Sequence, residues 1–147
     1  MSCIALQLEQ YNNNNTFLCE PIENTVIANS DYIKLIYSDN NVVMNGIALY
    51  FGMKVSSLHK QYVKYNFSFN YKDNKYWIEK IRTIEKDILD KIPNQKVRIY
   101  KISDLLNYGK LRIFSEKQEI SNNFVLVISG IWENTNSIGL TFKFRNV

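Results

Sequence analysis

The chain has 147 residues, the size of one domain that can bury a core without disulfides or metal. Its apolar content of 46% and charged content of 22% are those of an ordinary globular protein, and the absence of a long apolar run argues against a transmembrane helix. Residues 1–50 hold five acidic residues and one basic residue, a net charge of −4, whereas residues 51–147 hold 17 basic and 9 acidic residues, a net charge of +8.

The N-terminal sequence MSCIALQLEQ lacks the basic start and long apolar stretch of a signal peptide, so we expect none. The cysteines, Cys3 and Cys19, form no CxxC pair and make no disulfide framework. A reducing intracellular compartment fits this composition.

Residues 1–30 are weakly patterned and acidic. Asn12 to Asn15 form a polar tract that is typical of a loop. We expect residues 1–30 to be a weakly ordered N-terminal arm and residues 31–147 to form a single domain.

From residue 31 onward the chain becomes regular. Alternation predicts strands over 32–37, 42–51 and 62–71, with a bulge or bend at Gly46 in the second. Apolar residues then recur at helical spacing from Trp77 to Ile92, so we expect a helix that Asp73 or Asn74 caps and Pro93 ends. Further strands are predicted over 97–102, 110–114, 124–131 and 139–144, with a turn or helical turn at 104–108.

This order predicts a mainly β fold with one α-helix. A small OB-like barrel is the preferred architecture, because the OB-fold places its helix between the third and fourth strands. A sandwich or an open sheet backed by one helix remains the alternative.

The sequence contains no recognisable catalytic motif. His59 is the single histidine, and the chain contains no GxSxG, no glycine-rich phosphate loop and no HExxH. We therefore expect no enzyme, no cofactor and no metal site.

The predicted strands carry basic residues among aromatic ones. Arg98 and Tyr100 share a face, as do Lys110 and Arg112. Such faces suit single-stranded nucleic acid, because cations meet phosphates and rings stack on unpaired bases. The alternative is that they are only the solvent-facing half of each strand, where Lys and Arg discourage edge pairing. The candidate nucleic-acid-binding residues are Lys64, Lys72, Arg98, Tyr100, Lys110, Arg112, Trp132, Lys143 and Arg145.

The C-terminal stretch FVLVISGIWE, followed by GLTFKF, resembles the closing hairpin of small OB-fold single-stranded DNA-binding proteins of large DNA viruses. The helix-containing stretch that begins YWIEKI is similar in placement, and the resemblance covers about residues 31–147. It implies a protein of the host-cell cytoplasm or nucleus that coats exposed strands during viral genome replication, without catalysis. The departure is that the chain ends in KFRNV, whereas bacterial-type relatives end in an acidic tail that recruits partners.

The leading hypothesis is thus a non-enzymatic, sequence-independent single-stranded DNA-binding protein, with RNA as an open alternative ligand. Homo-oligomers are expected as a further possibility, and no membrane partner is expected. The second hypothesis is a structural or interaction protein, such as a virion component or adaptor, without a nucleic-acid role. A nuclease is the third.

Overall fold

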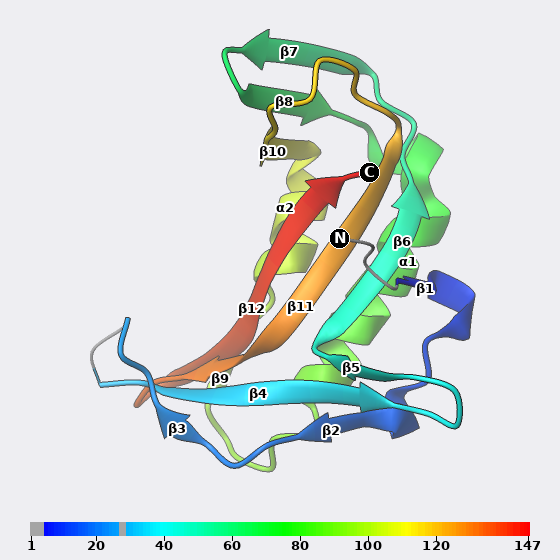
Figure 1. The fold of residues 1–147 in the computed structure, drawn as a ribbon. Helices are drawn as coiled ribbons and strands as arrows, with labels where there is room; N and C mark the ends of the chain where they lie inside the picture. The colour runs from blue at the N-terminus through cyan, green and yellow to red at the C-terminus, as the bar shows by residue number, and fades with distance from the viewer. Residues whose placement is uncertain (1–4, 27–28) are drawn as a thin grey trace.

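The computed structural model describes residues 5–26 and 29–147, and within them the chain is mainly β-strand with two α-helices (Figure 1). The strands form a nine-stranded sheet and a three-stranded sheet. The expectation of a mainly β fold is therefore confirmed.

The centre of the large sheet is β11 (Asn123–Glu133), which pairs along one side with β12 (Ser137–Asn146). On the other side, its first half pairs with β6 (Ile47–Gly52) and its second half with β4 (Asp31–Ser38). Because the two halves have different partners, the sheet turns from the upright β6 and β12 to the crosswise β4 at the lower end (Figure 1).

Short strands extend this sheet. β1 (Leu6–Gln7) lies parallel to β6, and β9 (Val97–Ile99) lies parallel to the start of β12. The three others, β2 (Thr16–Leu18), β3 (Ile22–Glu23) and β5 (Val43–Asn45), all pair antiparallel with β4.

The small sheet has the order β10–β8–β7, with β7 (Ser57–Gln61), β8 (Lys64–Ser68) and β10 (Lys110–Phe114). It lies at the upper end of the molecule (Figure 1). Among the described strands, none joins the two sheets, so they do not close into a barrel. The OB-like barrel is therefore not confirmed.

The predicted helix is confirmed as α1 (Tyr71–Leu89), which packs Trp77 and its isoleucines against the large sheet. Its cap is Asn70, whose side chain accepts a hydrogen bond from the Asp73 N–H, and not Asp73 or Asn74 as expected. Asn74 is instead buried, where it bonds both the N–H and the carbonyl of Lys54 and accepts a hydrogen bond from the Trp77 indole. It therefore ties the loop before β7 to the helix.

The second helix, α2 (Lys101–Tyr108), takes the place of the end of the predicted strand 97–102, and the turn or helical turn predicted at 104–108 is part of this helix. Glu85 of α1 explains why a helix begins here. Its buried carboxylate accepts hydrogen bonds from the N–H groups of Ile102 and Ser103, at 3.0 and 2.9 Å, and from the Ser103 hydroxyl. These are orphan donors of a helix N-terminus, so Glu85 fixes α2 on α1.

The N-terminal segment differs from the expected weakly ordered arm. Residues 5–26 contain β1, β2 and β3 together with two 3-10 turns, Leu8–Gln10 and Asn13–Asn15. Leu6, Leu8 and Thr16 are buried. The segment is therefore part of the core, while residues 1–4 and 27–28 of the expected arm lie outside the described residues.

Candidate nucleic-acid interface

Two unpaired sheet edges face each other across a groove. Within the described part of the chain, β10 pairs only with β8, and β12 has β9 as a neighbour only over Ser137–Gly139, so the rest of its outer edge is open. The groove between them has a volume of about 530 Å³. Its charged lining residues are Lys110, Arg112, Lys143 and Arg145, and its exposed or half-buried rings are Phe114, Phe142 and Phe144.

The glycine before β10 sets the position of that wall. Gly109 ends α2 with φ of +81°, the left-handed region that favours glycine. Its carbonyl accepts a hydrogen bond from the Phe69 N–H, and a Cβ there would lie 2.5 Å from the Phe69 oxygen. Gly109 thus lets the chain turn from α2 directly into the pairing of Lys110 with Ser68.

The four cations of the groove are available to a ligand. All four are exposed, and no ion pair engages them among the described residues. The Arg112 guanidinium donates a hydrogen bond only to the side chain of Asn66, at 3.3 Å, and the Lys110 ammonium lies 5.6 Å from the centre of the Tyr108 ring. Because no acidic side chain of residues 5–26 or 29–147 lines the groove, it is a site of uncompensated positive charge.

The rings differ in exposure along the groove. Phe114 is 68% exposed, an unusual state for phenylalanine, and it shares the outward face of β10 with Lys110 and Arg112. Phe142 and Phe144 are half-buried and meet edge to face, at 5.8 Å between ring centres. The groove therefore combines an apolar floor with cationic rims.

The positive surface continues over the small sheet. A second depression of about 650 Å³ shares Lys110 and Arg112 with the groove. It reaches His59 of β7 and Asn66 of β8, which are register partners. Asn66 is also the register partner of Arg112 on β10. Tyr108, which is 73% exposed, stands at its border.

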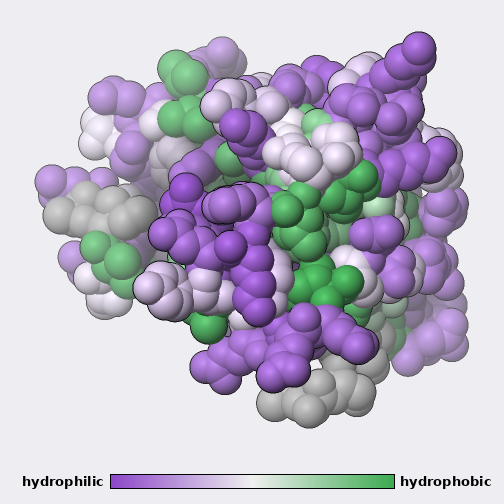
Figure 2. Space-filling model, turned by 90° about the horizontal axis from the view of Figure 1, so that it is seen from above, coloured by the Kyte–Doolittle hydropathy of each residue, from purple (hydrophilic) through white to green (hydrophobic). Residues whose placement is uncertain are grey.

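The other basic candidates on this side contribute less. Lys64 of β8 pairs with Phe114 and is half-buried at the border of the surface. Lys72 lies in the first turn of α1 and does not line either depression. Seen from above, the end of the molecule that carries β7 and β8 is largely hydrophilic, with hydrophobic side chains gathered near the middle (Figure 2).

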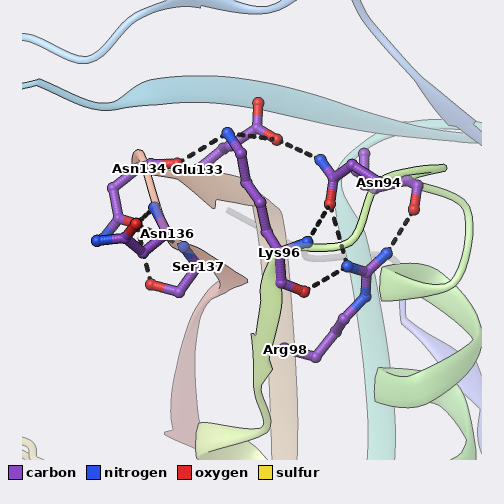
Figure 3. A network of polar contacts seen from close by, with 8 residues as sticks. Asn94, Lys96, Arg98, Glu133, Asn134, Asn136 and Ser137 are labelled. Carbon is purple, nitrogen blue, oxygen red and sulfur yellow. Dashed lines mark hydrogen bonds and ion pairs between the residues drawn. The ribbon is translucent and has the colours of Figure 1, made fainter.

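Arg98 stabilises the segment between α1 and β9. Its guanidinium donates hydrogen bonds to the carbonyls of Ile92 and Lys96 and to the side chain of Asn94 (Figure 3). In the same network, the Lys96 ammonium lies 3.4 Å from the Glu133 carboxylate. These contacts hold the chain between α1 and β9, and Arg98 does not line the groove.

Tyr100 and Trp132 also lie apart from the groove. Tyr100 precedes α2 and lines a separate cleft. The charged side chains of that cleft are two acidic and two basic, so it offers no net positive charge to an anionic ligand. Trp132 lies at the lower end of β11, where its ring covers Gly139. Sequence reasoning also missed Phe114, although alternation with Lys110 and Arg112 was a signal that could have found it.

A further depression, about 750 Å³, lies between the N-terminal segment and α1 and has mixed charge. Tyr76 donates a hydrogen bond to Glu9 across this depression. A backbone hydrogen bond, and secondly the hydrogen bond from Tyr76, lower the pKa of Glu9. No cluster of three or more His, Cys, Asp or Glu that could hold a metal ion occurs in the described part of the chain. No helix there has the length and apolar character needed to cross a membrane.

Comparisons with known proteins find no matching family model, no matching curated protein and no matching solved structure. The charge and shape of the groove are therefore the basis for inferring its function.

Proposed function

We propose that the chain binds single-stranded nucleic acid, without catalysis and without sequence preference, at the groove between β10 and β12. The observation that carries the proposal is that Lys110 and Arg112 on one wall, and Lys143 and Arg145 on the other, line a single groove. Cations on both rims can follow a phosphate backbone, while Phe114 can stack on an unpaired base.

The apolar content of the groove favours a single strand over a duplex. Phosphates alone need only a basic surface, but half-buried Phe142 and Phe144 offer no partner to a charged backbone. Unpaired bases have exposed π faces that such rings can receive. DNA is the ligand that the viral resemblance implies, and coating of exposed strands during genome replication is the corresponding role.

Fluorescence anisotropy of a labelled oligo-dT, titrated across salt concentrations, tests the proposal. We expect binding that weakens with salt, and a Lys110→Gln/Arg112→Gln variant should lower the slope of log K against log salt by about 1.4, or about 0.7 per lost contact. The matched control is Lys75→Gln/Lys80→Gln, which removes the same charge from exposed positions on α1. Equal effects of the two pairs, or no binding at low salt, would refute the proposal.

A structural or interaction protein remains the second candidate. The observation that favours it is the pair of open edges on β10 and β12, because unpaired edges can accept a strand from another chain. Light scattering without nucleic acid distinguishes the two functions: stable assembly combined with failure to bind oligo-dT would favour this candidate.

A further inference from the structure

The outer face of the large sheet carries a row of side chains in register across five strands. Ile22 of β3 pairs with Tyr32 of β4, which pairs with Trp132 of β11. Trp132 pairs with Gly139 of β12, which pairs with Ile99 of β9. Register partners project from the same face, and the alternate positions Ile33, Ile131 and Leu140 are buried, so these residues lie side by side on the face opposite the core.

Two glycines make room for the two aromatic rings of the row. A Cβ on Gly139 would lie 2.5 Å from the Trp132 indole, and a Cβ on Gly130 would lie 2.5 Å from the Tyr32 ring. Each ring therefore covers bare backbone with one side. Both side chains are partly exposed, so part of each ring remains accessible to solvent.

The charges around the rings favour an anionic ligand. Lys34 pairs with Gly130 two residues along from the Tyr32–Trp132 pair, so it lies on the same face as the rings. Lys143 and Arg145 project from this face further along β12. The acidic residues of these strands form a separate register row, Glu23, Asp31 and Glu133, which alternation directs to the other face. The rings thus share their face with cations.

We propose that Tyr32 and Trp132 form a stacking platform for unpaired bases, as a second contact region for the strand held in the groove. This inference rests on the proposed function. Lys143 connects the two regions, because it lines the groove and lies four residues along β12 from Gly139, a distance of about 13 Å. Stacking on the platform is independent of base identity, since every base has a π face.

Tryptophan emission gives a local readout of the platform. The chain has two tryptophans, and Trp77 is only 6% exposed and stacks on Phe51 with 4.4 Å between ring centres. A change of emission on binding therefore reports Trp132. We expect oligo-dT to quench the wild type, whereas the Trp132→Phe variant should bind oligo-dT, as measured by anisotropy, with unchanged emission.

Affinity gives an independent readout. Trp132→Ala should weaken oligo-dT binding by roughly 5- to 150-fold, and Trp132→Phe, which keeps a ring, by much less. The matched control is Tyr76→Ala, which removes a ring that is 60% exposed on α1. Unquenched emission in a wild type that binds, or equal affinities of Trp132→Ala and Tyr76→Ala, would overturn the platform. Failure of the wild type to bind would instead overturn the proposed function, and the platform with it.

Discussion

Replacing Glu85 by glutamine should destabilise the fold, and most strongly at acidic pH. The carboxylate accepts hydrogen bonds from Ile102 and Ser103 with both of its oxygens. Glutamine keeps one oxygen, so one buried donor at the start of α2 loses its acceptor, at a cost of about 1–3 kcal/mol. For a domain of this size, each kcal/mol lowers Tm by about 2–4 °C.

The pH dependence follows from the pKa of the buried carboxyl. Burial raises the pKa of Glu85 above its ordinary value of 4.5, against the opposing effect of its hydrogen bonds. The folded state therefore binds the proton more tightly than the unfolded state. The resulting stabilisation is fully present below pH 4.5 and is lost as the pH rises through the folded-state pKa. Glutamine does not titrate, so the deficit of the variant should shrink toward neutral pH.

Urea unfolding from about pH 4 to pH 7, followed by circular dichroism, measures this difference. Asp87→Asn is the matched control, because Asp87 is half-buried on the same helix. A deficit of Glu85→Gln that is constant or grows toward pH 7 would contradict the reasoning.

Two further substitutions test the fold and the charge distribution. Gly109→Ala should destabilise the fold by more than about 1 kcal/mol in calorimetry, because of the positive φ and the contact with the Phe69 oxygen. A Cβ at Gly52 would meet no atom closer than the Asn123 side-chain oxygen at 3.6 Å, so Gly52→Ala should be tolerated. Glu23→Gln should leave oligo-dT affinity within about twofold near physiological salt, where the Debye length is about 8 Å. β3 lies at the end of the molecule away from the small sheet (Figure 1), and Glu23 is directed to the face opposite Tyr32 and Trp132. A larger increase of affinity in anisotropy titrations would show that this carboxylate competes with phosphates.

The sequence predicts the long elements because their periodicity is strong. α1 follows from isoleucines at helical spacing, and β10 and β12 follow from alternation. The hairpin between β7 and β8 escaped prediction because its turn lies at Tyr62, which adopts φ of +57° without a glycine. β1 and β3 have two residues each, too few for any period to show.

The sequence predicts part of the groove, for the same reason. Alternation groups Lys110 with Arg112, and Lys143 with Arg145, but only the fold brings the two pairs together. The role of Arg98 could not be read in advance, because its partners are backbone carbonyls whose direction depends on how α1 ends.

Photocrosslinking of an oligo-dT, with the adducts mapped by mass spectrometry, tests the nucleic-acid groove most directly. We expect adducts on β10 and on the C-terminal half of β12, at or next to Phe114 and Phe142. Adducts confined to the exposed tyrosines of α1, Tyr71 and Tyr76, would contradict a binding site between the two open sheet edges.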